Sequence, residues 1–410
     1  MSDETLQQFS ESIRGELENN LVPFWCERII DVEYGGFIGQ MSNDGKIDPK
    51  APKGLILNAR LLWTFSALYR SNQDPRSLSM AQRAYDYLEA HFWDRSHGGT
   101  FWEVDFQGHL LDNKKKIYGQ AFYIYALAEY YRAVGEPSAL QRAVDVFKLI
   151  DMHSRDETFR GYIEVCNRDW SVAEDLRLSE KDMDEKKSMN NHLHLLEAYT
   201  NLYRIWLDPQ LRERLAELID LFEQNIQDPA TDHLHHFFDE AWEPRSANYT
   251  FGHDIEASWL LCEAANILGD ANVASRTQDL ARRLAQVTLA EGFDDDGGLC
   301  YEGEAGRITD SNREWWPQAE SVVGFLNAYE LSGDPSFLKA AQKAWVFIEK
   351  YFVDRDYGDW YWRIDLTGRP DPAEPKVSQW KGPYHSVRAC LETIRRLEHI
   401  TQADRNGNNR

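Results

Sequence analysis

Cysteine is scarce in this chain of 410 residues, and the few cysteines present form no C-x-x-C pair. They are odd in number, so neither a disulfide framework nor a cysteine-based metal site is indicated. The chain also lacks an apolar run of about 18 residues, and its first residues lack the basic and apolar regions of a signal peptide. We therefore expect a reduced, cytoplasmic protein. The cysteines are Cys26, Cys166, Cys262, Cys300 and Cys390.

Positive charge is also deficient, since 45 Lys and Arg face 68 Asp and Glu for a net charge of −23. Nucleic acid and anionic membranes both require a basic face, so we expect neither as a partner. No G-x-G-x-x-G, P-loop or G-x-S-x-G motif occurs, and we expect no nucleotide cofactor. His233, His235 and His236 have no companion ligand at metal spacing, and Asp294–Asp296 lacks a calcium-loop pattern, so no metal is expected.

A short turn signature recurs six times along the chain, in five copies around a glycine and in one around a histidine. The copies lie 61 to 72 residues apart. This spacing indicates one supersecondary unit repeated six times. The markers are Gly35, Gly98, Gly161, His233, Gly297 and Gly358.

Alternating apolar and polar residues follow each marker and predict a short hairpin, whereas the period between hairpins is 3.6. The periodicity predicts a helix before each marker, over 4–30, 78–93, 137–152, 209–226, 271–290 and 334–351. It predicts another after each marker, over 57–72, 117–134, 189–207, 253–269, 314–332 and 381–400. Six such pairs without a linker predict one all-α domain over 1–410, an (α/α)6 barrel (toroid) of twelve helices with short β-hairpins. The tail from about residue 402 is expected to be flexible.

Polar and aromatic residues gather near the beginning of the second helix of each pair. Inner helices that run parallel open their N-termini at one end, so these side chains should converge on one cavity that favours negative charge. Aromatic faces stack on sugars while Arg, Asn, Gln and Glu bind hydroxyls, which makes a neutral sugar the expected partner. The candidates are Asn58, Arg60, Tyr118, Gln120, Asn190, His192, His194, His253, Asp254, Glu256, Trp315, Trp316, Gln318, Glu320, Trp380, Tyr384, His385 and Arg388.

Histidines occupy similar positions in three different units, which favours a shared chemical role. Glu256 lies three residues after His253 on the same helical face and is placed to orient that imidazole or to bind a hydroxyl. His192 and His194 lie on opposite sides of one helix, and of the two we choose His194 to face the sugar. His385 is the histidine of the last unit.

Several segments resemble the cellobiose 2-epimerases of the N-acylglucosamine 2-epimerase superfamily, over about residues 24–397. The resemblance implies that His253 and His385 form the catalytic acid/base pair and that His194 assists ring opening. After His385 the family usually has Asn-Gly-Arg, where this chain has Ser-Val-Arg. The sugar would be bound by Arg60, Tyr118, Asp182, Asn190, Glu256, Trp316 and Trp380, and we add Glu320 to this set. The matching segments are Asn58–Phe65, Met189–Tyr199, Phe251–Leu261, Trp315–Glu320 and Trp380–His385.

Inverting C2 of a reducing sugar requires proton removal, a planar enediolate and proton return on the opposite face. Two imidazoles suit these steps because each acts as a base in one direction and as an acid in the other. Arg60 would stabilise the C1 oxyanion. We therefore expect a cofactor-independent sugar 2-epimerase that acts on the reducing-end glucose of β-1,4 disaccharides such as cellobiose or lactose, as a monomer or weak homodimer.

Four alternatives stay open. An epimerase of free glucose and mannose would use the same residues, and an aldose–ketose (mannose) isomerase would return the proton to C1 instead. An (α/α)6 glycoside hydrolase would need two carboxylates, for which Asp254, Glu256 and Glu320 are candidates. A sugar-binding protein without activity would need only aromatic and amide side chains, and the histidines disfavour both of these last two classes.

Overall fold

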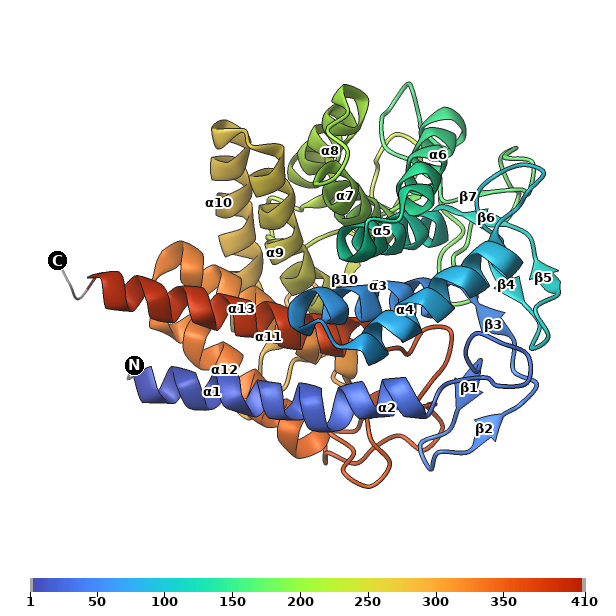
Figure 1. Ribbon diagram of the computed structural model, residues 1–410. Helices are drawn as coiled ribbons and strands as arrows, with labels where there is room; N and C mark the ends of the chain where they lie inside the picture. Colours follow the sequence, from blue (N-terminus) through green and yellow to red (C-terminus); the bar gives the residue numbers. More distant parts are fainter. Residues whose placement is uncertain (1–2, 408–410) are drawn as a thin grey trace.

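A closed ring of six inner helices forms the centre of the computed structural model, which describes residues 3–407 (Figure 1). Each inner helix packs against the next, and the last packs back against the first. The inner helices are α3 (Leu55–Asn72), α5 (Ile117–Val134), α7 (Met189–Tyr203), α9 (Phe251–Leu268), α11 (Trp315–Ser332) and α13 (Tyr384–Gly407).

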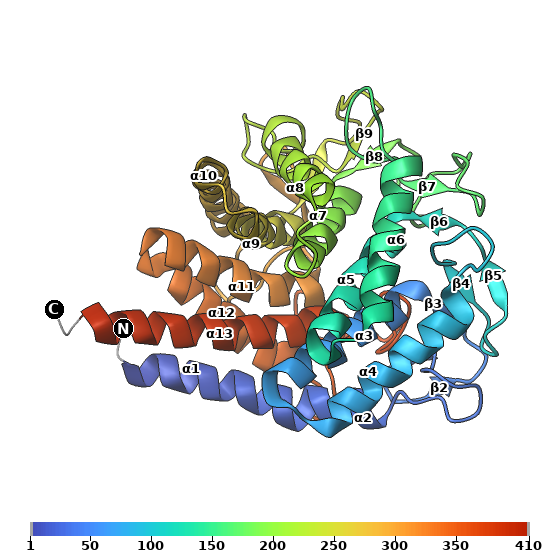
Figure 2. The ribbon, with the colours of Figure 1, turned by 45° about the horizontal axis from the view of Figure 1, so that its top comes forward.

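An outer layer of helices covers this ring, one outer helix against each inner helix. α1 (Asp3–Glu16) continues through a π-helical turn, Leu17–Leu21, into α2 (Val22–Glu27), and α1 lies alongside α13 (Figure 2). Similar π-helical turns, Leu88–Phe92, Phe222–Ile226 and Thr288–Gly292, extend three other outer helices. The predicted twelve-helix (α/α)6 toroid is confirmed. The remaining outer helices are α4 (Pro75–Tyr87), α6 (Pro137–His153), α8 (Pro209–Leu221), α10 (Ala271–Val287) and α12 (Pro335–Tyr351).

Local sequence explains how inner and outer helices are joined. Inner helices α5, α9 and α11 end at Gly135, Gly269 and Gly333, each with a φ near 70°, a conformation that glycine adopts without strain. An acidic residue then caps the outer helix, as where Asp334 accepts a hydrogen bond from the Ser336 N–H. Proline follows the cap in most outer helices, since its missing N–H costs nothing in the first turn.

Short antiparallel strands link each unit to the next at one end of the ring. In five places the strand ahead of an inner helix pairs with a strand of the following unit, and the Met41–Val377 bridge joins the sixth unit to the first. All six inner helices therefore begin at the same end. The pairs are β3 (Lys53–Gly54) with β4 (Glu103–Val104), β6 (Lys115–Lys116) with β7 (Val165–Cys166), β8 (Lys187–Ser188) with β9 (Phe237–Phe238), β10 (Asn248–Thr250) with β11 (Glu302–Glu304), and β13 (Arg313–Glu314) with β14 (Arg363–Ile364).

The other strands complete small sheets at the same end. β1 (Gln40–Met41) pairs with β2 (Ile47–Asp48), β5 (Leu110–Asp112) adds to β4, and β12 (Arg307–Asp310) adds to β11. The strands gather on the right of the molecule in Figure 2.

The six turn markers occupy equivalent places where an outer helix ends. Each lies inside a β-bridge of similar span, from Ile30–Phe37 in the first unit to Val353–Trp360 in the last. Five marker glycines have a positive φ, and in the fourth unit Asp232 takes this conformation (φ 64°) just before His233. Buried lysines hold several turns, as where Lys187 Nζ lies 2.7 Å from Asp156 Oδ2. These lysines, two residues ahead of the inner helices, were missed in the sequence analysis.

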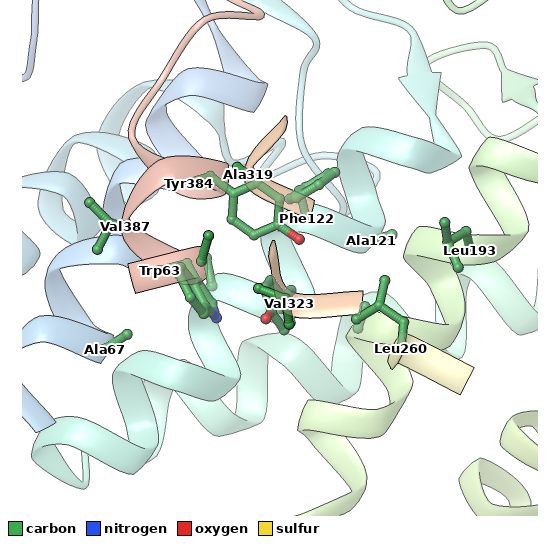
Figure 3. Packing of buried hydrophobic residues seen from close by; sticks show 14 of the residues in the cluster. Trp63, Ala67, Ala121, Phe122, Leu193, Leu260, Ala319, Val323, Tyr384 and Val387 are labelled. Atoms are coloured by element: carbon green, nitrogen blue, oxygen red, sulfur yellow. The ribbon is translucent and has the colours of Figure 1, made fainter. Parts of the chain in front are cut away.

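Inner helices are buried along most of their length because neighbours, the outer layer and the ring interior enclose them. Trp63 of α3 and Phe122 of α5 both pack against Tyr384 of α13, with ring centroids 5.4 and 5.3 Å away (Figure 3). Side chains from three successive helices of the ring, α13, α3 and α5, thus pack together on its inside.

The last predicted helix begins three residues late, at Tyr384, because Gly382 and Pro383 precede it. Helix α13 continues to Gly407, so it includes the first residues of the segment from about residue 402 that we expected to form a tail. Residues 408–410 lie outside the described residues. No helix within 3–407 is long and apolar enough to cross a membrane. All five cysteines are buried and free.

Candidate active site

The second and sixth residues of the inner helices carry the side chains that meet across the ring. These two positions are four apart, so they share one helical face. The second position supplies Tyr118, Asn190, Trp316 and His385, and the sixth supplies Arg60, Phe122, His194, Glu256 and Glu320.

The fourth residue of these helices instead supports the hairpins, contrary to our expectation that all candidates converge on one cavity. Gln120 and Gln318 each exchange two hydrogen bonds with the backbone of a turn. His192 accepts the Tyr162 N–H at 2.9 Å through Nε2 and lies 2.7 Å from the Ser188 carbonyl through Nδ1. Both of its nitrogens are occupied, so His192 has a structural role. Asn58 and Asp254 also hydrogen-bond near the helix start.

Trp316 contacts both of the histidines that are expected to transfer protons. Its ring centroid is 4.7 Å from that of His253 and 5.7 Å from that of His385. Both histidines lie in the first turn of their helices and therefore at the same end of the ring. The His194 ring is 5.0 Å from Tyr118.

Each of the three imidazoles is fixed through its Nδ1 atom. His385 Nδ1 lies 2.7 Å from Glu320 Oε1, and His194 Nδ1 lies 2.9 Å from Glu197 Oε2. Ionised carboxylates only accept hydrogen bonds, so these two imidazoles carry a proton on Nδ1. His253 Nδ1 contacts the Thr250 hydroxyl at 2.5 Å rather than Glu256. The Nε2 atoms are left for a substrate.

Arg388 binds three carboxylates from three different helices. Its Nη2 donates to Glu256 at 2.5 Å and to Glu320 at 2.7 Å, and its Nη1 donates to Glu197 and to the Tyr384 hydroxyl. Arg388 is 1% exposed. One guanidinium therefore ties α7, α9 and α11 to α13 beneath the imidazoles.

Arg60 packs against aromatic side chains of the site. Its guanidinium lies over the rings of Phe122 and Tyr384, at 4.4 and 4.9 Å, and donates to the Tyr118 hydroxyl at 2.9 Å. Arg60 also donates to the backbone carbonyl of Trp380 at 3.3 Å. The site therefore contains a second buried arginine, which has no carboxylate partner within residues 3–407.

Trp380 forms an aromatic surface with Trp102, whose ring centroid is 5.8 Å away, and Tyr118 at 6.2 Å. Lys116 covers the Trp102 ring at 4.7 Å. Trp102 and Lys116 belong to the second unit and Trp380 to the sixth, so this surface is built from two units.

Two predicted binding residues lie near the third inner helix. Asp182, in the loop ahead of α7, accepts hydrogen bonds from the Ser179 N–H and hydroxyl at 2.7 and 2.8 Å. Asn190 is half-buried, and its Oδ1 atom has no hydrogen-bond partner among the described residues. Asn190 is therefore free to bind a hydroxyl, whereas Asp182 also serves to shape its loop.

Burial controls the protonation of the site. It lowers the pKa of His385 to about 3 and takes the pKa of His194 and His253 below the ordinary value. Burial and the nearby Glu320 charge raise the pKa of Glu256. Burial also acts to raise the pKa of Glu320, but the Arg388 charge and the His385 hydrogen bond together lower it. The imidazoles are therefore neutral at neutral pH and able to accept protons.

Glu256, Glu320 and His385 present ligand atoms within 4.8 Å of one another, a geometry that could hold a metal ion. However, the Arg388 guanidinium already binds both carboxylates. A cation there would face a fixed positive charge, so the residues do not fit a metal centre.

Four residues of the site were missed in the sequence analysis: Glu197, Thr250, Trp102 and Phe122. Glu197 lies three residues after His194, a spacing that could have identified it as the partner of that histidine. Phe122 could have been found by aligning the units, since it occupies the position of Arg60 and His194. Thr250 and Trp102 lie outside the inner helices and gave no signal.

Comparison with known proteins places the chain among sugar epimerases. The family model for N-acylglucosamine 2-epimerase (GlcNAc 2-epimerase) matches residues 36–389. A cellobiose 2-epimerase of Bacteroides fragilis is 43% identical over 96% of this chain and 99% of its own length, and one of Dictyoglomus turgidum is 39% identical over 96% and 100%. The solved structure of cellobiose 2-epimerase from Bacillus thermoamylovorans, 40% identical, superposes with a TM-score of 0.91 over 95% of this chain and 100% of that one. The chain belongs to the N-acylglucosamine 2-epimerase family.

Proposed function

We propose that this protein is a cofactor-independent 2-epimerase that interconverts reducing-end glucose and mannose units of β-1,4 disaccharides such as cellobiose and lactose. The observation that carries the proposal is that Trp316 contacts both His253 and His385, so that two neutral bases lie beside one aromatic side chain at the same end of the ring. Relatives over nearly the whole chain are named for the same reaction on cellobiose.

The reaction begins with opening of the sugar ring, in which His194 assists by moving the proton of the C1 hydroxyl. One imidazole Nε2, of His253 or His385, then takes the proton from C2. The C2–H electrons form a C1–C2 double bond, and the carbonyl electrons move to the C1 oxygen. The product of this step is a planar cis-enediolate.

Protonation of the opposite face of C2 completes the inversion. The other imidazole, neutral in the resting site, takes up a proton from solvent once the negatively charged enediolate lies beside it and gives that proton to C2, and the electrons on the C1 oxygen restore the carbonyl. The first imidazole then returns its proton to solvent. Because either histidine takes either role, the same site works in both directions.

Arg60 is the group best suited to hold the enediolate oxygen. A buried guanidinium is worth more to a developing charge than one in water, and Arg60 has no carboxylate partner to neutralise it. Its contacts with Phe122 and Tyr384 keep it in place.

Preference for a disaccharide is supported by the aromatic surface that Trp380 forms with Trp102. A sugar ring beyond the reducing-end unit would stack there. An isomerase would use the same enediolate but return the proton to C1, and the residues described fit both reactions.

Hydrolysis is disfavoured because the candidate carboxylates are already engaged. Glu256 and Glu320 bind Arg388, and Asp254 binds His233 at 2.7 Å. None of the three is left as a free acid opposite a free base, which the hydrolase mechanisms require.

The proposed activity is tested by incubating the protein separately with cellobiose, lactose, mannose and fructose without added cofactor. Glucosyl-mannose from cellobiose and epilactose from lactose are the expected products. Conversion of free mannose alone would support the monosaccharide epimerase, and accumulation of a ketose would support the isomerase. Release of glucose from cellobiose would contradict the proposal.

We further propose that the protein acts in the cytoplasm as a monomer or weak homodimer. The buried free cysteines suit a reducing compartment. Sedimentation over a range of protein concentrations tests the oligomeric state.

A further inference from the structure

The hydroxyl group of Thr250 lies between two imidazoles instead of capping its helix. Thr250 is the N-cap residue of α9, yet its side chain makes no capping hydrogen bond. Ser188, the N-cap of α7, does accept the Asn191 N–H at 3.1 Å, which is the usual arrangement. The Thr250 hydroxyl lies 2.5 Å from His253 Nδ1 and 3.2 Å from His236 Nε2. The Thr250 hydroxyl therefore contacts two histidines instead of forming the hydrogen bond that would stabilise the start of α9.

The backbone determines which nitrogen of His236 carries its proton. The Thr250 N–H points to His236 Nε2 at 3.0 Å. An amide can only donate, so this nitrogen must present its lone pair and the proton must lie on Nδ1. Burial lowers the pKa of His236 to about 4, so the ring is neutral at neutral pH. His236 is thus a fixed hydrogen-bond acceptor.

A fixed acceptor orients the hydroxyl group beside it. The Thr250 O–H shares the His236 Nε2 lone pair with the Thr250 N–H in a three-centre hydrogen bond, and its oxygen is then free to accept from His253. In that arrangement the proton of neutral His253 lies on Nδ1, and Nε2 keeps its lone pair. No described residue hydrogen-bonds to His253 Nε2, and Trp316, which also contacts His385, lies beside this ring at 4.7 Å.

We propose that Thr250 and His236 are positioning residues that hold His253 in the Nδ1–H tautomer and so present its Nε2 atom as a base. The functional part of this proposal rests on the proposed role of His253 in proton transfer. Without the relay, an imidazole in a buried site would exchange between two tautomers, of which only one can accept the C2 proton.

The other histidines of the site reach the same tautomer by a different route. Glu320 and Glu197, both ionised, fix His385 and His194. His253 instead has a neutral relay, since its Nδ1 contacts the Thr250 hydroxyl rather than Glu256, the carboxylate on its own helix face. A hydroxyl orients the ring without adding another negative charge beside Glu256 and Glu320.

The tautomer can be observed directly in protein labelled with 15N-histidine, through two-bond 1H–15N spectra at neutral pH. The His253 signals are identified by their loss in His253→Ala. We expect the Nδ1–H tautomer in the wild-type protein and in Thr250→Ser. In Thr250→Val, which removes the hydroxyl but keeps the backbone N–H, we expect the Nε2–H form or a mixture. An Nε2–H ring in the wild type, or an unchanged spectrum in Thr250→Val, would overturn the proposal.

Kinetics provide a second readout that a purely structural role would not produce. Thr250→Val should lower kcat at least about tenfold with KM nearly unchanged, since a wrongly placed imidazole proton blocks chemistry rather than binding. His236→Phe should have a similar effect, and Thr250→Ser should restore most of the rate. The matched control is Thr288→Val, because the Thr288 hydroxyl is equally buried but donates only to the Leu284 carbonyl at the end of an outer helix.

These two measurements separate the relay from the proposed function. Wild-type protein without epimerase activity would refute the function, while the spectra would still decide the tautomer. Active wild type with a normal rate in Thr250→Val would overturn the relay and leave the function standing.

Discussion

Replacing Arg388 by methionine would leave three buried carboxylates without the cation that they share. The Arg388 side chain is 2% exposed, and those of Glu197, Glu256 and Glu320 are 1% exposed. Methionine fills much of the same volume, so the main effect is electrostatic. Breaking a buried ion pair by removing one partner costs about 3–5 kcal/mol.

The expected shift in melting temperature follows from the size of the chain. An unfolding entropy of about 2.1 cal/mol/K per residue gives roughly 0.9 kcal/mol/K for a chain of this length. A loss of about 3–5 kcal/mol then lowers Tm by about 3–6 °C.

The loss of stability in Arg388→Met should depend on pH in a defined direction. Burial acts to raise the pKa of Glu197 and Glu320, but Arg388 helps to keep both pKa values below the ordinary value. The two carboxylates therefore stabilise the fold at a pH above the ordinary value, and their contribution to stability falls as the pH is lowered. Without Arg388, burial raises both pKa values, and the carboxylates take up protons in the folded state. The difference in Tm between wild type and variant should therefore be largest near neutral pH and shrink toward about pH 5.

Thermal unfolding followed by circular dichroism at several pH values measures this difference. Arg395→Met is the control on the same helix, since the Arg395 side chain is 49% exposed and pairs with Glu392; it should shift Tm by about 1 °C or less. An Arg388→Met variant as stable as Arg395→Met, or a deficit that grows toward acid pH, would refute the reasoning.

Three further outcomes are expected. Epimerase activity should survive exhaustive dialysis against EDTA, because Arg388 already neutralises Glu256 and Glu320; loss that a divalent ion restores would contradict this. Trp380→Ala should reduce kcat/KM for cellobiose about fivefold more than for free mannose, as expected for one lost stacking contact, and equal losses would place Trp380 against the reacting ring. Because burial lowers the pKa of His385 to about 3, the pH profile of kcat/KM should stay flat below the ordinary histidine value, and a midpoint near 6.5 would count against buried neutral bases.

The fold was predictable from the sequence because its repeat is marked by residues that the turns require. Glycines with positive φ mark five of the six turns, and a change of period from 2 to 3.6 recurs in each unit. The helix starts were less accurate, as at Tyr384, since Gly382 and Pro383 lie inside an otherwise helical pattern.

The site was only partly predictable, because one helix presents different faces to different neighbours. Position near a helix start did not distinguish residues that meet across the ring, such as Trp316, from those that support hairpins, such as Gln318. Contacts between units, as between Trp102 and Trp380, depend on ring closure. Thr250 gave no signal because its contact with His236 joins the helix start to a different hairpin segment.

The central claim, that His253 and His385 act on opposite faces of C2, is tested most directly by epimerisation in D2O. The newly formed epimer should carry deuterium at C2, because the protonated imidazoles exchange with solvent. His253→Ala and His385→Ala should each abolish epimerisation, while one variant or both still exchange the C2 hydrogen of a single epimer without inversion. Substantial epimerase activity in either variant would contradict the two-base account and transfer the role to His194 or Glu256.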